Sequence, residues 1–170
     1  MICAEDEIGV GKSHDGIIVI TDDVKPGTPA ADYYNLTSDY VIEVDLTPNR
    51  IDAASHFGVA RDLAAWDACH RDGAALKRPA VDGFHVDDPD GDAIRVKVED
   101  AEACIRYSGV TIRNVAVKES PDWLKQRLTA IGQRPINNIV DVTNYILHGF
   151  GQPLHSFDAD RIAGGEIIVK

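Results

Sequence analysis

The run RPINNIVDVTNYILHGFGQPLHSFD, residues 134–158, holds the clearest structural signals in the second half of the chain. Its early asparagines belong to the residue types that cap free N–H groups at a helix start. A glycine at position 149 is of the type that ends helices. The apolar stripe expected at helical spacing consists of Ile139, Val142 or Thr143, and Ile146. The run therefore predicts a helix over residues 137–147, ended by Gly149.

A second helix is expected just before this run. In the tetrapeptide SPDW at residues 120–123, the serine is suited to cap the helix, the proline fits the first turn and the aspartate complements the helix dipole. A glycine at position 132 marks its end. Its buried stripe is expected to consist of Leu124, Leu128 and Ile131.

Strands are predicted on both sides of the two helices. Apolar and charged residues alternate over residues 94–98, and residues 166–170 form another short apolar run. One or two further strands are expected over residues 107–117. The order strand, helix, helix, strand is typical of a mixed α/β layer, which is the fold class that we expect.

The first half of the chain is predicted to hold two short strands and one helix. The strands are expected over residues 17–20 and over residues 40–46, where apolar positions alternate strictly. A helix is expected from Asp52, as its N-cap, to about Cys69, with Gly58 marking a place of close packing. The Gly-, Pro- and Asp-rich residues 72–92 are typical of a linker.

Composition narrows the class of protein. With 170 residues, 44% hydrophobic and 26% charged, the chain resembles ordinary soluble proteins, and its apolar runs are far too short to span a membrane. The acidic N-terminus lacks the features of a secretory signal, so we expect the cytoplasm. Three separated cysteines and scattered histidines predict neither disulfides nor a metal site. The GVGKS run at residues 9–13 has Asp6 where a P-loop needs glycine, so no cofactor is expected in this chain.

Charge is distributed unevenly. The net charge is −11, a poor match for a nucleic-acid partner. Residues 1–100 carry 9 Lys and Arg against 21 Asp and Glu, a net charge of −12, whereas residues 101–170 carry 8 against 7, a net charge of +1. Any contact with phosphate groups is therefore expected in the second part.

The polar residues of the run at 134–158 admit two interpretations. Asparagines, an aspartate and a threonine are weak helix formers, so helix propensity does not explain them. In the first interpretation Asn137 or Asn138 caps the helix and the other side chains bond the local backbone. In the second, Thr143 and Asn144 point into a polar pocket, joined by His155. The histidine itself fits either a hydrogen-bonded position in a loop, which is the commoner case, or a proton donor to a reacting group.

Two stretches resemble one known family. Residues 46–50, LTPNR, followed by GVARDLAA at residues 58–65, are similar to a signature of phenylalanyl-tRNA synthetase beta chains, and residues 134–158 closely resemble the run that opens the editing domain of that subunit. RYSG at residues 106–109 and the closing residues 164–170 fit in the same order. The resemblance covers essentially the whole chain.

The resemblance implies a heterotetramer of two alpha and two beta chains that attaches phenylalanine to its tRNA with ATP and magnesium. The aminoacylation site belongs to the alpha chain. The beta chain contributes tRNA contacts and an editing site that hydrolyses tyrosine wrongly attached to the phenylalanine tRNA. By motif match, Thr143, Asn144 and His155 line that editing pocket, where they bind the ester or the terminal ribose and position the attacking water, with no covalent nucleophile.

The same resemblance implies three segments. Residues 1–31 are expected to be the tail of a tRNA-binding-like β domain, residues 32–80 a small strand-helix domain with the TPNR motif, and residues 81–170 the first part of the editing domain. The acidic residue that recognises the tyrosine hydroxyl belongs to a later segment of the family. Ser156 replaces a common alanine, and LHGF at residues 147–150 is a local variant.

We therefore expect a piece of the beta subunit with an incomplete editing site and no activity of its own. Two alternatives stay open. One is a freestanding deacylase of mischarged tRNA, and the other is a non-catalytic module that docks on the alpha subunit.

Overall fold

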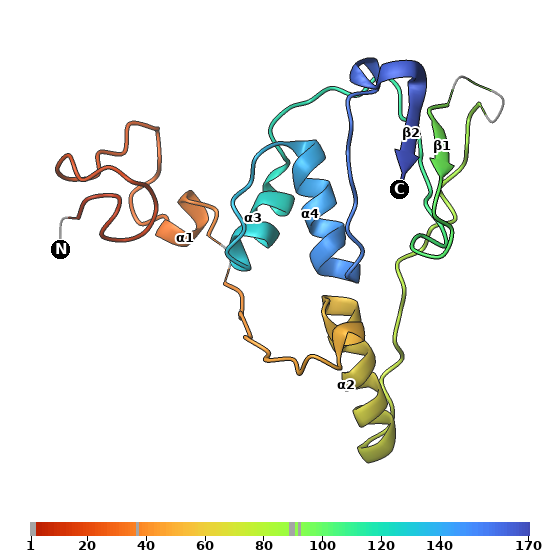
Figure 1. Ribbon diagram of the computed structural model, residues 1–170. Coiled ribbons are helices and arrows are strands. Elements are labelled where there is room, and N and C mark those ends of the chain that lie inside the picture. The colour runs from red at the N-terminus through yellow and green to blue at the C-terminus, as the bar shows by residue number, and fades with distance from the viewer. Residues whose placement is uncertain (1–2, 37, 89–90, 92) are drawn as a thin grey trace. The chain divides into compact units, whose positions relative to one another are not determined.

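The computed structural model describes residues 3–36, 38–88, 91 and 93–170. The chain forms two compact units, Met1–Ile42 and Glu43–Lys170 (Figure 1). In the first unit the described residues form one helix, α1 (Ala30–Tyr33). The second unit contains α2 (His56–His70), β1 (Arg95–Val98), α3 (Asp122–Ala130), α4 (Asn138–Phe150) and β2 (Glu166–Val169), with short 3-10 helices at Ile51–Ala53, Ala159–Arg161 and Ala163–Gly165. The expected mixed α/β class is confirmed.

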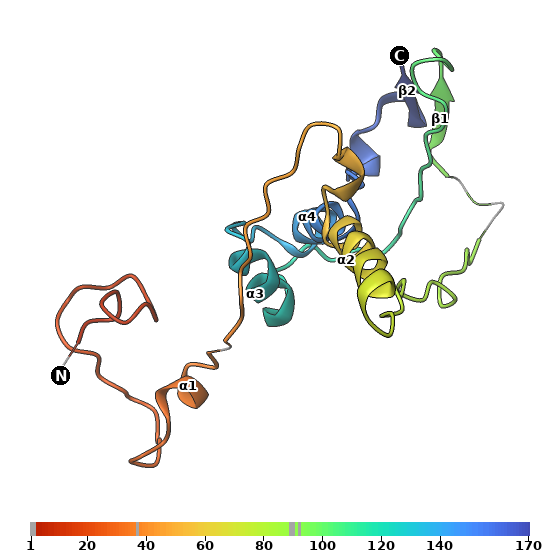
Figure 2. The same ribbon diagram turned by 90° about the horizontal axis from the view of Figure 1, so that it is seen from below.

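The two strands form a small parallel sheet (Figure 2). Arg95 pairs with Glu166 at one end of the register and Val98 with Val169 at the other. The Glu99 N–H extends the ladder by donating to the Val169 carbonyl at 2.8 Å. Parallel strands need a long crossover connection, and here that connection carries α3 and α4. The predicted order strand, helix, helix, strand is therefore confirmed.

The packed centre of the second unit lies between α3 and α4. Leu124 and Leu128, one helical turn apart on α3, are each only 1% exposed. The Trp123 ring meets the Tyr145 ring of α4 edge to face, with 5.5 Å between centroids. Gly132 follows α3 with a φ of 75°, a left-handed conformation that glycine adopts readily. The predicted buried leucines and the predicted stop of α3 are confirmed.

The ends of these helices differ in part from the sequence-based expectation. Ser120 does not cap α3, because its hydroxyl donates to the carboxylate of Asp141 instead. Gly149 does not end α4, which continues to Phe150. The end comes at Gly151, whose φ of 75° turns the chain out of the helix while its N–H donates to the Leu147 carbonyl at 2.7 Å.

The start of α2 also differs. The N-cap is Ser55, whose hydroxyl accepts a hydrogen bond from the Gly58 N–H at 2.9 Å, and not Asp52. Asp52 lies one turn earlier in a 3-10 helix, where its carboxylate bonds two arginines. The expected close packing at Gly58 is confirmed, since an added Cβ would lie 2.5 Å from the Asp52 carbonyl oxygen.

Three predicted strands are absent from the described residues. Residues 17–20, 40–46 and 107–117 have no strand assignment. Side chains that alternate along residues 40–46 are open to solvent, with Tyr40 at 92% and Ile42 at 80% exposure. A strand needs a neighbour to pair its backbone groups, and β1 and β2 pair only with each other within the part of the chain described here. Those three predictions were wrong.

Candidate functional site

The run at residues 134–158 starts with an asparagine that builds the helix. The Asn137 side-chain oxygen accepts hydrogen bonds from the N–H groups of Ile139 and Val140, both at 3.0 Å. These N–H groups have no partner within the helix, so Asn137 is the N-cap of α4. The first interpretation of this residue is confirmed.

The next asparagine ties α4 to the segment before α3. The Asn138 amide oxygen accepts from the Lys118 N–H, and its amide nitrogen donates to the Ala116 carbonyl, each at 3.0 Å. The Asn138 N–H also donates to the Lys118 carbonyl at 2.9 Å. Asn138 alone thus makes three hydrogen bonds with the backbone of residues 116–118, groups that a neighbouring strand could otherwise pair.

A buried carboxylate completes this arrangement. Asp141 is 0% exposed, and its two oxygens accept from the Ser120 hydroxyl and from the Ile136 N–H, the latter at 2.8 Å. A buried carboxylate is tolerated only when its oxygens are hydrogen bonded. Asp141 therefore fixes both the residue before α3 and the entry into α4.

Thr143 and Asn144 lie on the middle of α4, and both are partly buried. The Thr143 hydroxyl donates to the Val140 carbonyl of the preceding turn at 2.7 Å. No side-chain hydrogen bond of Asn144 is found among the described residues. Consecutive helix residues point about 100° apart around the axis, so the two side chains face different directions.

His155 lies in the extended segment that follows α4. Its side chain is exposed, and its nearest ring neighbour is Phe157, with 6.2 Å between ring centroids. Within residues 93–170, no hydrogen bond joins His155 to Thr143 or Asn144. The structure thus puts all three predicted residues on one stretch but does not connect them through shared contacts.

The start of α2 meets the end of α4. The Nδ1 atom of His56 lies 2.9 Å from the His148 carbonyl oxygen. The rings of Phe57 and Phe150 are 5.8 Å apart between centroids. This junction brings the two family-like motifs together in space, which sequence reasoning missed because spacing along a chain carries no information on contacts between distant helices.

The TPNR motif forms a cluster of charges beside α2. Arg50 donates to Asp52 at 3.1 Å and to Asp62 at 2.6 Å, and Arg61 also bonds Asp52. The hydrogen bond from Arg50, with the charges of both arginines, lowers the pKa of Asp52. The hydrogen bonds of Arg50 to Asp52 and to Asp62 raise the pKa of Arg50. Arg50 of the TPNR motif and Arg61 of α2 thus bond Asp52 and Asp62, and these ion pairs hold the turn before α2.

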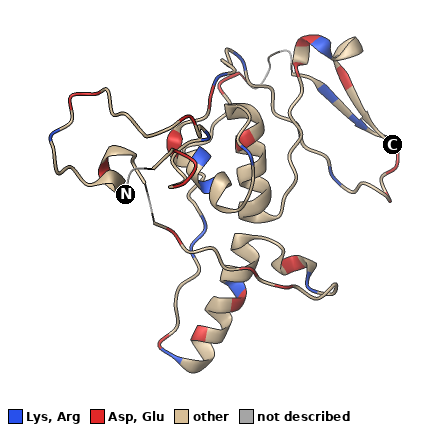
Figure 3. Cartoon of the chain, turned by 90° about the vertical axis from the view of Figure 1, so that its left-hand side faces the viewer, with Lys and Arg blue, Asp and Glu red and all other residues tan. Residues whose placement is uncertain are grey.

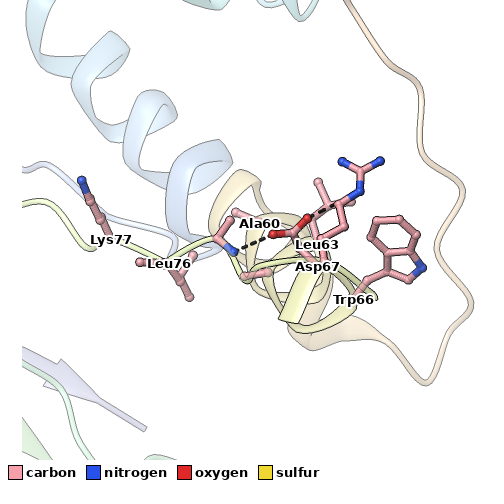
Figure 4. A pocket seen from close by; sticks show the side chains of 10 residues that line it. Ala60, Leu63, Trp66, Asp67, Leu76 and Lys77 are labelled. Carbon is pink, nitrogen blue, oxygen red and sulfur yellow. Dashed lines mark hydrogen bonds and ion pairs between the residues drawn. The ribbon is translucent and has the colours of Figure 1, made fainter. Parts of the chain in front are cut away.

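An open hollow lies beside the second half of α2 (Figure 4). It has a volume of about 490 Å³ and lies between α2 and the segment that follows it. Asp67 holds that segment by accepting from the Ala74 N–H at 2.6 Å. Trp66 and Leu63 line it, whereas none of Thr143, Asn144 and His155 does. This hollow is therefore separate from the predicted site residues.

Charges and cysteines add no further site to the described part of the chain. In the view of Figure 3 the Lys and Arg positions spread over several elements and form no single stripe. Within the residues described, no group of three or more His, Cys, Asp and Glu side chains could hold a metal ion. Cys3, Cys69 and Cys104 are free thiols. None of the described helices has both the length and the apolar character needed to cross a membrane.

The sequence of the chain is similar to that of known proteins. Residues 103–170 match the family model of the B3/4 domain. The whole chain is 65% identical to the phenylalanine–tRNA ligase beta subunit of Bacteroides fragilis strain YCH46 over 170 residues, 21% of that protein. It is 59% identical to the same subunit of Porphyromonas gingivalis strain W83 and 47% identical to that of Salinibacter ruber, with 20% of each protein covered. The chain thus spans about a fifth of the length of these curated relatives, and over its full length it is similar to phenylalanine–tRNA ligase beta subunits.

Proposed function

We propose that the chain forms the entry to a hydrolytic editing domain, which removes tyrosine wrongly attached to the phenylalanine tRNA. The observation that carries this proposal is the B3/4 match over residues 103–170, within a chain that is 65% identical to a ligase beta subunit. Editing has a physical purpose. A pocket that accepts phenylalanine rejects an analogue with one added hydroxyl only weakly, so a second site must check the product.

The surrounding assembly is part of the proposal. The chain acts within a cytoplasmic ligase of two alpha and two beta subunits, with the phenylalanine tRNA as substrate. ATP and magnesium serve the aminoacylation site of the alpha subunit, and no step of the editing chemistry is assigned to them. Residues 1–31 form the tail of a tRNA-binding-like domain, residues 32–80 the domain with the TPNR motif, and residues 81–170 the start of the editing domain.

The editing reaction is the hydrolysis of an ester. Water attacks the carbonyl carbon, the bond from that carbon to the ribose oxygen breaks, and the ribose oxygen takes up a proton. His155, exposed on its segment, orients the water or transfers this proton. Because the Thr143 hydroxyl already donates to Val140, it can offer a ligand only its lone pairs. The Asn144 amide has both a donor and an acceptor for the ester or the ribose.

The isolated chain is proposed to be inactive. His155 stands on an exposed segment, and no contact among residues 93–170 holds it against Thr143 or Asn144. Ester hydrolysis by positioned groups needs the reacting atoms held about 3–3.5 Å apart. The absence of deacylation by the purified 170-residue chain is the expected result, and clear turnover would favour a freestanding deacylase instead.

The proposal is tested in a hybrid ligase. In this enzyme the 170 residues replace the matching stretch of the B. fragilis beta subunit, which is 65% identical. His155→Ala should lower deacylation of tyrosyl-tRNA for phenylalanine by about 10²- to 10⁴-fold, and leave attachment of phenylalanine unchanged. His85→Ala is the matched control, since His85 is exposed and, within the part of the chain described, bonds Asp87 and the Gly83 carbonyl alone. Unchanged deacylation in His155→Ala would rule out the assigned role.

A docking role on the alpha subunit is the second candidate. Large apolar side chains of the second unit are open to solvent, among them Trp123 on α3 and Ile136 before α4. Such surfaces are typical of sites that another protein surface covers. Stable co-purification of the chain with the alpha subunit, without deacylation, would support this role, and failure to bind would exclude it.

A further inference from the structure

The contact between α2 and α4 lies at the point where the chain leaves α4 for His155. His56 is the first residue of α2, and its Nδ1 atom lies 2.9 Å from the carbonyl oxygen of His148 in the last turn of α4. A carbonyl oxygen can only accept a hydrogen bond, so the proton must be on Nδ1. His148 belongs to the last four residues of α4, whose carbonyl groups lack partners within the helix. His56 therefore supplies a donor that the helix end needs.

Phe150 and Gly151, which follow His148 at the end of α4, pack closely against the start of α2. The rings of Phe57 and Phe150 pack with 5.8 Å between centroids and an interplanar angle of 32°. At Gly151 an added Cβ would lie 3.3 Å from the Ala54 carbonyl oxygen and 3.5 Å from the Ser55 Cβ. The φ of Gly151 is 75°, a region that other residues rarely adopt. The direction in which the chain leaves α4 is thus fixed against the turn that precedes α2.

His155 follows four residues later on a segment with little support of its own. Among the described residues, the one side-chain hydrogen bond of the segment from Gly151 to His155 is the long contact of Gln152 Nε2 with the Pro153 carbonyl at 3.4 Å. Residues 151–160 are all exposed. Where the segment goes is therefore decided mainly at its start, at the junction with α2.

We propose that His56 is a positioning residue for the editing reaction, which acts through the end of α4 on the place of His155. This inference rests on the proposed function of His155. It connects the two family-like motifs in one mechanism, because the helix that follows TPNR then supports the segment that carries the proposed proton-transfer group. His56 itself does not touch the substrate.

The substitution His56→Ala removes the donor without weakening α2, since alanine is the better helix former. His56→Asn restores it, because the asparagine amide nitrogen is separated from Cα by the same number of bonds as Nδ1 of histidine. The matched control is His70→Ala at the other end of α2. His70 also bonds a backbone carbonyl, that of Trp66 at 2.7 Å, but within its own helix.

The experiment measures kcat and KM for deacylation of tyrosyl-tRNA for phenylalanine by the hybrid ligase, together with the rate of phenylalanine attachment. We expect His56→Ala to lower the deacylation kcat by about 10- to 100-fold with KM unchanged, because a misplacement of about 1 Å can reduce a rate by that factor. Asn at position 56 should restore most of the rate. His70→Ala and the attachment reaction should be unaffected.

Each other outcome overturns the inference. The His155→Ala variant shows whether the positioning role of His56 alone is wrong or the proposed function as well. If His155→Ala abolishes deacylation while His56→Ala leaves it intact, the positioning role is wrong and the proposed function stands. If His56→Ala and His56→Asn lose deacylation and phenylalanine attachment together, the effect is general damage to the fold. If His155→Ala itself has no effect, the proposed function and this inference both fail.

Discussion

At the scale of single residues, a polar group that already has a partner inside the protein is a weaker candidate for ligand binding than one without. Hydrogen bonds at the start of α4 and to the segment before α3 already occupy the side chains of Asn137, Asn138 and Asp141. The Thr143 hydroxyl donates its hydrogen bond to the Val140 carbonyl. Among the described residues no side-chain hydrogen bond is found for Asn144 or His155, which makes them the stronger candidates within the run.

The buried carboxylate should be essential for the stability of the helix pair. Asp141→Ala leaves without their acceptor the hydroxyl of the buried Ser120 and the Ile136 N–H, whose hydrogen bond is partly buried. Each buried donor left unpaired reduces the free energy of unfolding by about 1–3 kcal/mol. We expect faster hydrogen exchange of the α4 amides in Asp141→Ala than in Asp160→Ala, an exposed aspartate on a 3-10 helix. Equal exchange in the two variants would contradict the structural role.

The charge cluster before α2 should make that helix sensitive to acid. The pKa of Asp52 is lowered from 3.8 by the hydrogen bond from Arg50 and the charges of both arginines, so its ionised form stabilises the folded state. This stabilisation is fully present above pH 3.8 and is lost as the pH falls through the lowered pKa. Asp52→Asn should therefore reduce protection of the α2 amides at neutral pH, and its difference from the parent chain should vanish in strong acid. A difference that persists at low pH would exclude this cause.

The cap of α4 was predictable from the sequence, whereas the hydrogen bonds between residues far apart in the chain were not. Asn137 as a cap follows from local hydrogen bonding, which depends only on neighbours in the chain. The pairing of Ser120 with Asp141 and of His56 with His148 joins residues far apart in the sequence. Such pairs depend on how helices pack, so the local pattern assigned Ser120 to a capping role that it does not have.

At the scale of elements, the helices were predictable and most strands were not. A helix satisfies its backbone groups within itself, so apolar spacing and end signals suffice to place α3 and α4 to within a few residues. A strand takes its hydrogen bonds from a partner elsewhere in the chain. The strand predicted over residues 94–98 pairs with the one predicted over residues 166–170. The equally regular residues 40–46 have no partner strand among those described.

Two glycines in helices offer a direct test of the packing at the start of α2. At Gly58 an added Cβ would lie 2.5 Å from the Asp52 carbonyl oxygen and 2.6 Å from the Ala53 Cα, so the backbone would have to move. At Gly149 on α4 nothing lies within 4 Å of an added Cβ. Gly58→Ala should lower the free energy of unfolding of α2 by about 1–3 kcal/mol, and Gly149→Ala should raise that of α4 by up to about 1 kcal/mol. Hydrogen exchange of each helix measures both, and a stabilised Gly58→Ala variant would refute the close contact.

At the scale of the whole molecule, the chain leaves much apolar surface uncovered. Large apolar side chains are open to solvent in both units, among them Ile20 at 50%, Ile51 at 84% and Ile105 at 92% exposure. The described apolar residues with buried side chains are few: Ala4, Ala53, Leu124 and Leu128. A two-stranded sheet also has both outer edges unpaired. These features fit a stretch whose surfaces are covered in an assembly.

The isolated chain should consequently unfold with weak cooperativity. The dependence of the unfolding free energy on urea, the m value, grows with the surface exposed on unfolding. Because so many large apolar side chains are already exposed in the folded chain, we expect an m value clearly below that of a compact domain of the same length. Far-UV circular dichroism during a urea titration measures it, on material shown by size-exclusion chromatography to be monomeric, because association through the sheet edges would cover apolar surface and raise the value. A monomer with the full m value of a compact domain would show that its apolar side chains are covered from within, and the docking candidate would lose its support.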